Sequence, residues 1–173
     1  MNNSKMMKVS NPMLIGAMEL LKKDKSPESI KMFMDEVLHA RFLAPVVITP
    51  EPEVGEDGKV KLTEENKISI PMIPAPDGKK FFLAYTDMAE LNKMGAKGKV
   101  NVMGFTFTDY AVMVAKSDED CDGFVINPQG NGPIVNKAMV AAIMNTVLKR
   151  KQEKVDVQQP AEGTVETVET TEE

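Results

Sequence analysis

The chain has 173 residues, the size of one domain with tails, and can bury about 70% of its unfolded surface without disulfides or metal. Its single cysteine, Cys121, cannot pair within the chain, which favours a reducing compartment. No apolar stretch approaches the ~20 residues that a membrane helix needs, and Glu19 interrupts the apolar run near the N-terminus. We therefore expect a cytoplasmic protein with no membrane partner.

The net charge of −5 is unevenly distributed along the chain. Residues 155–173 contain acidic side chains and no Lys or Arg, so they carry −6 and leave +1 for residues 1–154. A balanced body with no Trp and only two Tyr offers little to attract phosphates or to stack on bases. Nucleic acid is therefore not an expected partner.

Two amphipathic helices are predicted after a flexible arm at residues 1–10. Asn11 is predicted to cap the first helix, with Pro12 at its first position, and Ser26-Pro27 begins the second. The apolar positions at helical spacing are Leu14, Ala17, Met18 and Leu21 in the first helix, and Ile30, Phe33, Met34, Val37 and Leu38 in the second. Neither stripe is stable alone in water, so both helices should pack on a sheet.

Five strands are predicted, at residues 42–48, 68–72, 81–85, 100–103 and 124–126. Residues 49–66 are rich in Pro, Gly and acids, which predicts an exposed acidic loop insertion with a small hairpin around residues 60–62. The turn signal Pro76-Asp77-Gly78 should join the second and third strands as an antiparallel hairpin.

Two further helices follow from capping patterns. Asp87 and Glu90 have the spacing of a capping box and open a short helix. Thr106 and Asp109 form a second capping box, and the apolar side chains on either side of it, Phe105 and Tyr110, stand at the positions of a hydrophobic staple. That helix should run to about residue 116.

The last helix is predicted from about residue 137 to 151, with Asn136 as its cap. Beyond it the chain lacks large apolar side chains and cannot offset its ordering entropy, so residues 153–173 are expected to be a disordered acidic tail. The domain itself should span residues 11–152. Its element order predicts an α/β (α+β) fold: a mixed five-stranded sheet with an antiparallel hairpin, flanked by about five helices.

The stretch at residues 123–133 reads Gly-Phe-Val-Ile-Asn-Pro-Gln-Gly-Asn-Gly-Pro. Its apolar tripeptide is expected to be a buried strand that ends at Asn127-Pro128, because proline lacks the N–H that a sheet ladder needs. Gly130 and Gly132 are expected to adopt backbone angles that residues with a Cβ avoid.

The segment Gly-Phe-Val-Ile-Asn-Pro resembles a signature of the SseB family, named for an enhanced serine sensitivity phenotype. Other matching pieces follow in the expected order: Asn11-Pro12 with Leu14 and Ala17, then Phe42-Leu43-Ala44-Pro45-Val46, then Tyr85-Thr86-Asp87 with Leu91. The chain departs from the family at Tyr85, often Phe, at Asp87, often Ser, and in its longer acidic insertion after Pro50. The resemblance covers roughly residues 11–136 and implies no agreed active site.

The polar turn after the buried strand is the strongest candidate for a ligand site. A turn between a strand and a helix can bind an anion through free N–H groups. The residues that could do so are Asn127, Gln129, Gly130, Asn131, Gly132 and Asn136. Because the turn lacks the lysine of a phosphate-binding loop and contains two prolines, we favour the alternative that its side chains satisfy local backbone groups.

Catalytic and metal-binding patterns are weak. His39, the only histidine, could act in acid–base chemistry, but neither Ser117 nor Cys121 lies in a nucleophile motif. The acidic run Asp118, Glu119, Asp120 and Asp122 lacks the glycine and the closing glutamate of a calcium loop. We therefore expect no catalytic residues, no metal and no cofactor.

Two functions remain open. The favoured one is a non-catalytic interaction or regulatory module that binds another protein or a second copy of itself. The alternative is a small anionic ligand-binding or enzyme domain that uses the turn at residues 127–136. The fourteen methionines are compatible with either flexible core filling or an adaptable partner surface.

Overall fold

The computed structural model describes residues 8–95, 100–117 and 120–157. Its helices are α1 (Pro12–Lys23), α2 (Pro27–His39), α3 (Met88–Asn92), α4 (Phe107–Lys116) and α5 (Lys137–Val157), with a 3-10 turn η1 (Pro128–Gly130). Its strands are β1 (Arg41–Thr49), β2 (Glu53–Val54), β3 (Val60–Lys61), β4 (Lys67–Ser69), β5 (Met72–Pro74), β6 (Lys80–Ala84), β7 (Asn101–Thr106), β8 (Cys121–Ile126) and β9 (Ile134–Asn136).

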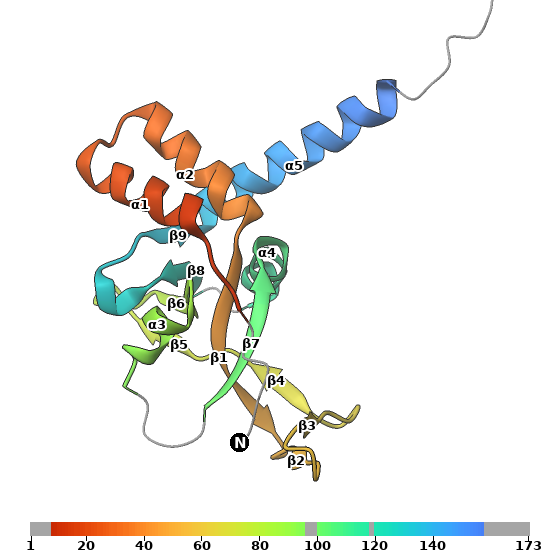
Figure 1. The fold of residues 1–173 in the computed structure, drawn as a ribbon. Coiled ribbons are helices and arrows are strands. Elements are labelled where there is room, and N and C mark those ends of the chain that lie inside the picture. Colours follow the sequence, from red (N-terminus) through yellow and green to blue (C-terminus); the bar gives the residue numbers. More distant parts are fainter. Residues whose placement is uncertain (1–7, 96–99, 118–119, 158–173) are drawn as a thin grey trace, which may run out of the picture.

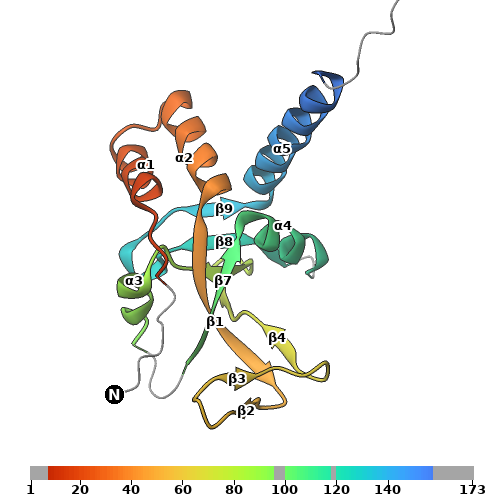
Figure 2. The ribbon, with the colours of Figure 1, turned by 45° about the vertical axis from the view of Figure 1, so that its right-hand side comes forward.

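The described strands form three small sheets, so the prediction of a single five-stranded sheet is wrong. Their orders are β4-β1-β7, β2-β3 and β5-β6-β8-β9, and β6 and β8 are the parallel pair. The two larger sheets meet at a single bridge, where Leu43 and Tyr85 exchange backbone hydrogen bonds of 2.8 Å each. The β2-β3 hairpin lies at the opposite end of the molecule from α1 and α2 (Figures 1 and 2). The class, mixed α+β, is as predicted.

The sheets separate because one predicted strand is divided between them. Residues 68–72 were expected to be one strand beside 81–85, but β4 pairs with β1 and β5 pairs with β6. Pro71 stands between β4 and β5 and has no N–H to give to a ladder. The predicted turn at Pro76-Asp77-Gly78 is present, with Gly78 at φ 85°.

The predicted caps at Asp87 of α3 and Thr106 of α4 are confirmed, and Ser26, where the second helix was predicted to begin, caps α2. The Thr106–Asp109 capping box is complete, and the rings of Phe105 and Tyr110 meet edge to face with centroids 5.9 Å apart. Helix α5, however, continues to Val157, so residues 153–157 are helical and the disordered tail was predicted to begin too early. The rest of that predicted tail, residues 158–173, lies outside the described part of the chain.

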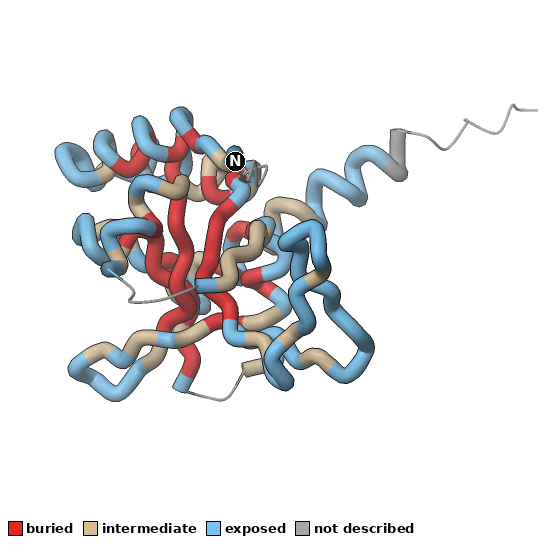
Figure 3. Tube along the Cα trace, turned by 60° about the horizontal axis from the view of Figure 1, so that its bottom comes forward, coloured by how far each residue is buried: buried red, intermediate tan, exposed pale blue. Residues whose placement is uncertain are grey.

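The core lies on both faces of β8, because successive side chains of a strand point to opposite sides. Phe124 and Ile126 are fully buried in the larger cluster, which contains residues of α1, α2, α4 and α5. Val125 belongs to a smaller cluster with Tyr85 and with Leu91 of α3. The predicted burial of the tripeptide is thus confirmed. Figure 3 shows the buried positions gathered in the central strands and the exposed ones along the outer half of α5.

The prediction that Gly130 and Gly132 adopt backbone angles that residues with a Cβ avoid is wrong. The positive φ angles there belong to Asn127 (48°) and Asn131 (50°), and not to Gly130 or Gly132. Gly132 is required for a different reason: a Cβ at this position would lie 1.6 Å from the carbonyl oxygen of Ile126. The turn therefore packs its own backbone against the end of β8.

We expect Gly132→Ala to destabilise the protein by at least ~3 kcal/mol, because a backbone carbonyl cannot move aside as a flexible side chain can. Gly16→Ala is the matched control, since Gly16 lies within α1 and a Cβ there meets nothing within 4 Å. The control should gain about 0.5–1 kcal/mol from helix propensity. Urea unfolding of both variants measures the effect, and a Gly132→Ala variant as stable as the wild type would contradict this packing.

Candidate functional site

The predicted site residues lie together in the turn between β8 and α5, but most of the backbone donors there are already used. The bonds run from Ile126 N to Pro133 O (3.0 Å), from Gly130 N to Asn127 O (2.9 Å), from Asn131 N to Pro128 O (3.3 Å) and from Gly132 N to Asn127 O (3.2 Å). At the far end of the turn, Oδ1 of Asn136 accepts a hydrogen bond from Met139 N at 2.9 Å and caps α5 as predicted. These bonds favour the structural interpretation of the turn over an anion site.

Asn127 is buried, and both polar atoms of its side-chain amide are hydrogen-bonded to Thr86. Its Oδ1 accepts a hydrogen bond from Thr86 N at 3.0 Å, and its Nδ2 donates to Thr86 Oγ1 at 2.9 Å. Thr86 is itself fully buried, two residues after the end of β6. Because β6 and β8 are parallel neighbours, these hydrogen bonds link the residues that follow the two strands at the same edge of the sheet.

Asn11 extends this network in a way that the sequence did not predict. It stands at the cap position of α1, yet its side chain makes no capping bond. Its Nδ2 donates instead to Thr86 O and to Arg41 O, each at 2.8 Å, and its Oδ1 accepts from Arg41 N at 3.1 Å. The start of α1 is thereby fixed to the start of β1 and to the end of β6.

Asp87 completes the network and joins it to α3. Thr86 Oγ1 donates to Asp87 Oδ2 at 2.9 Å, while Asp87 Oδ1 accepts from Glu90 N at 2.9 Å as the predicted cap. Asn11, Thr86, Asp87 and Asn127 all belong to the motifs quoted above for the family resemblance. The structure thus brings these motifs together as one hydrogen-bonded junction.

Tyr85 lies beside this junction and carries an unpaired polar group. Its hydroxyl is buried and has no partner at hydrogen-bonding geometry in the described part of the chain, although the side chain of Gln129 approaches it. Burial raises the pKa of the Tyr85 phenol, and Gln129 offsets part of that rise. Tyr110, by contrast, donates to Leu83 O at 2.8 Å, and burial raises its pKa strongly.

The other candidate residues are held in separate places. The ring Nδ1 of His39 is 2.7 Å from the carbonyl oxygen of Asp35 on its own helix. Cys121 is buried in β8, with its Sγ 3.9 Å from Gly123 O. Within the described residues, no group of three His, Cys, Asp or Glu side chains is arranged to hold a metal ion.

The acidic run at residues 118–122 lies partly within the described residues. Asp120 and Asp122 form ion pairs with Lys80 (2.9 Å) and Lys79 (3.2 Å). The hydrogen bond and charge of Lys80 lower the pKa of the Asp120 carboxyl. Asp118 and Glu119 of the same predicted loop lie outside the described residues.

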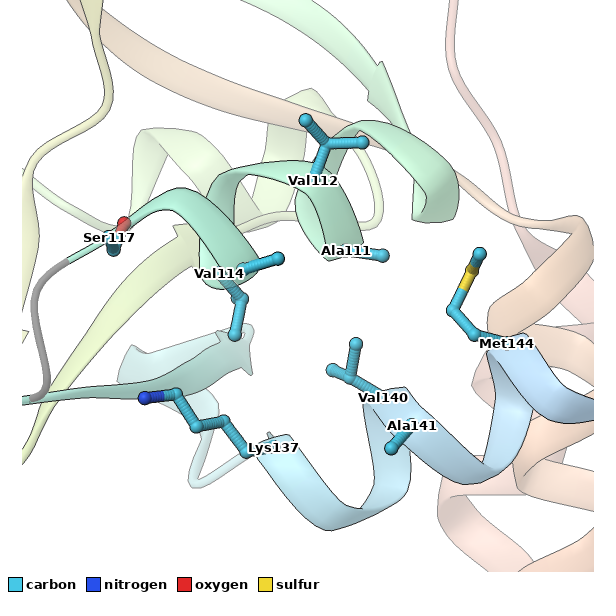
Figure 4. Close-up of a pocket in the computed structure, with 9 residues that line it drawn as sticks. Ala111, Val112, Val114, Ser117, Lys137, Val140, Ala141 and Met144 are labelled. Carbon is cyan, nitrogen blue, oxygen red and sulfur yellow. The ribbon is translucent and has the colours of Figure 1, made fainter.

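Sequence reasoning missed an apolar groove between α4 and α5. Its volume is about 470 Å³, and Figure 4 shows it between the two helices, with Val140 and Met144 of α5 pointing toward α4. Ala111, Val112, Val114 and Ala115 line it from α4, and Val140, Ala141 and Met144 from α5, with Ser117 and Lys137 at one end. We refer to this set as the α4–α5 groove. The apolar spacing of both helices predicted buried faces, but it could not show that the helices would stand apart.

A second groove, of about 390 Å³, lies on the other side of α5. It is lined by Ile30, Met34 and Leu38 of α2 and by Ile143 of α5, and the ion pair between Arg150 and Asp35 (3.2 Å) lies at its edge. Past these grooves α5 runs away from the body of the molecule (Figures 1 and 2). No helix in the described residues is both long and apolar enough to cross a membrane.

The two helices that border the groove contain more cations than acids, but most of these cations are not among the residues that line it. Residues 107–117 and 137–154 contain six cationic side chains and two acidic ones, on a chain whose net charge is −5. The cations are Lys116, Lys137, Lys149, Arg150, Lys151 and Lys154. Asp109, one of the two acids, is occupied by the α4 cap. Of these six cations Lys137 lines the groove, whereas Arg150 is paired with Asp35 at another groove on α5. Three acids, at positions 118, 119 and 120, follow Ser117 in the sequence, so charge does not select an acidic neighbour for the groove.

The fold and its buried junction define a mixed α+β domain held together by its polar motif residues. The model of the SseB protein N-terminal domain matches residues 14–146, so the chain belongs to that family, as the resemblance indicated. The comparisons with curated proteins and with solved structures give no match.

Replacing Asn127 and Asn131, the two asparagines with positive φ, one at a time by glycine should separate the contribution of the junction to stability from that of the turn's backbone conformation. Asn127→Gly keeps the backbone conformation but leaves the buried Thr86 N–H without an acceptor, so we expect a loss of about 2–4 kcal/mol. Asn131→Gly is the matched control, because Asn131 has nearly the same φ and an exposed side chain, and it should change stability by less than ~0.5 kcal/mol. Equal losses in urea unfolding would show that the junction contributes little.

Proposed function

We propose that this chain is a non-catalytic protein-protein interaction module that binds an apolar segment of another protein along the α4–α5 groove. The observation that carries the proposal is the groove itself, an open apolar depression between two helices. Helical and extended peptide segments bind such grooves by inserting apolar anchors.

Exposed apolar side chains on the two helices support this proposal. Val112 is 44% exposed on α4, and Leu148 is 53% exposed on α5, one turn beyond Met144. Neighbouring exposed apolar side chains beside a groove are typical of interaction sites, whereas single ones are common on any surface. A partner that covered them would remove this apolar area from water at about 25 cal/mol per Å².

The polar contacts described above also support a non-catalytic role. Asn127 and Thr86 use each other's polar groups, and His39 and Cys121 make local contacts on different elements. General acid–base or nucleophilic catalysis needs such groups side by side. The function is therefore better sought on the helical surface than at the turn.

Affinity purification from lysate should test this proposal when it is combined with matched variants of the full chain. We expect Ala141→Glu, which places a carboxylate in the groove, to lose a partner that the wild type retains. Val54→Glu is the control, because Val54 is 63% exposed on the distant β2-β3 hairpin. A partner that binds all three proteins equally, or a strict monomer with no specific partner in light scattering, would count against the proposal.

A second candidate function is favoured by one observation, the unpaired hydroxyl of Tyr85 beneath the turn. A small anionic ligand that reached Asn127, Gln129 or Asn131 could accept a hydrogen bond from this hydroxyl, since a buried donor without a partner is costly. Binding to the turn would make the chain a ligand-binding or enzyme domain.

Thermal shift against anionic metabolites, amino acids and nucleotides should discriminate between the two functions. A ligand at 100-fold its Kd should stabilise the chain by ~2.7 kcal/mol. The gain should be lost in Gln129→Ala and kept in Ala141→Glu. No shift across the panel would end the case for the turn.

A further inference from the structure

We propose that two copies of this chain pair through the outer edge of β7, antiparallel and with a two-fold axis at Met103. The inference goes beyond the proposed function, because the α4–α5 groove includes no residue of β7. Strand β7 ends the β4-β1-β7 sheet and pairs with β1 along one side. Figures 1 and 2 show it beside β1 below the start of α4.

The contacts of β1 determine which backbone groups of β7 point away from it. In an antiparallel pair, successive residues turn their N–H and C=O alternately toward and away from the neighbouring strand. Leu43 exchanges its N–H and C=O with Tyr85, on the side of β1 away from β7. Arg41, two residues earlier, gives both groups to the side chain of Asn11. Arg41, Leu43 and, by the same alternation, Pro45 therefore make no ladder bonds to β7.

The residues opposite these positions turn their backbone groups to the outer edge of β7. Gly104 lies opposite Leu43, and Val102 lies opposite Pro45. Outside the β1 ladder, the described residues make no hydrogen bond to the N–H or C=O of either residue. Thr106 also faces outward, but its N–H already donates to Asp109 Oδ2 at 2.7 Å. The edge thus presents donors and acceptors at alternate residues, which is the pattern that another extended strand matches.

Strand β7 also lacks the features that usually protect an edge strand from pairing. Its six residues keep one register with β1, none of them is buried, and none is charged or a proline. The other edge strands of the two larger sheets are each three residues long: β4 begins with Lys67, β5 ends with Pro74 and β9 follows Pro133. Natural proteins protect edges by short length, charge or proline, so β7 is the edge that remains open to pairing.

Symmetry selects a second copy as the occupant. With the axis at Met103, Val102 of each copy lies opposite Gly104 of the other, and the outward N–H and C=O of both residues are all bonded. An axis at Gly104 would instead place Val102 opposite Thr106, whose N–H is already used. An axis at Val102 would place Gly104 opposite Val100, which lies outside β7. Because β7 carries no charge, the symmetric pairing brings no like charges face to face.

The pairing would give the two copies one continuous sheet in the order β4-β1-β7-β7-β1-β4. An interface made by one pair of strands belongs to the small class, so the association should be weak and dependent on concentration. Copies of the chain would be about half dimeric at tens to hundreds of micromolar, a range that such small interfaces reach.

Sedimentation of the full chain with two matched variants tests the proposal. Val102→Pro removes the outward N–H and leaves the ladder to β1 intact, whereas Val102→Ala removes the same side chain and keeps the N–H. We expect the wild type and Val102→Ala to dimerise with similar Kd, and Val102→Pro to raise the Kd by at least about tenfold, because it deletes a hydrogen bond from each copy. A wild type that is monomeric at about 1 mM would overturn the proposal, and so would equal association of the two variants.

Amide hydrogen exchange in the wild type tests the same pairing without a substitution, in case Val102→Pro does not fold. The amides of Val102 and Gly104 should exchange at least about fivefold more slowly at 1 mM than at 20 µM, relative to the amide of Met103, which points to β1 at both concentrations. Rates at Val102 and Gly104 that do not depend on concentration would refute the edge pairing.

A groove variant separates this inference from the proposed function. Ala141→Glu should dimerise like the wild type, because Ala141 lies on α5 and lines the groove. A dimer that is lost in Ala141→Glu and kept in Val102→Pro would show that the copies meet at the groove, and the edge pairing would be wrong. If dimerisation follows Val102→Pro and no other protein is retained by the wild type, the edge pairing stands and the proposed function fails.

Discussion

The structure depends on the buried hydrogen bonds that Thr86 makes to Asn127 and Asn11. Thr86 N, O and Oγ1 each have a partner side chain, from segments 41 and 75 residues away in the sequence. Buried amide and hydroxyl groups are costly without partners and stabilising with them, so these bonds select a single arrangement of β6, β8 and α1. The apolar core would tolerate small shifts of these elements, but the junction would not.

The junction lies at the weakest point of the sheet architecture. Among the described residues the two larger sheets share the bridge between Leu43 and Tyr85 and no other, and Thr86 follows directly after it. Two backbone hydrogen bonds are a narrow connection between sheets. Asn11 adds bonds to Arg41 at the start of β1, so side chains reinforce the seam where the backbone ladder is short. This placement explains why polar motif residues are buried here and why most of the donors of the adjoining turn are used within it.

The sequence predicted the features that depend on neighbouring residues and missed those that depend on distant ones. The capping box of Thr106 and Asp109 and the buried tripeptide at residues 124–126 follow from local spacing, and both were predicted. Asn11 looks like an ordinary helix cap, because nothing in its own segment shows that Arg41 and Thr86 will be its partners. Pro71 is a similar case. It interrupts the chain locally between β4 and β5, but its own segment does not show that these strands will pair with different partners, β1 and β6. The α4–α5 groove could not be predicted at all, since it results from the spacing of two helices.

The turn after β8 and the helix α5 differ in how completely their side chains and backbone groups are already in contact with the rest of the chain. Around the junction, hydrogen bonds and close backbone packing at Gly132 leave little freedom for a ligand to exploit. Along α5 the opposite holds: apolar side chains stay partly exposed, and both flanks are hollow. Apolar side chains that are exposed to water are unfavourable, and a segment that covers them removes this unfavourable contact. Because the body beneath them is already ordered, binding does not add the entropy cost of ordering it. The junction thus fixes β6, β8 and α1 relative to one another, while α5 leaves apolar surface exposed at the other side of the core.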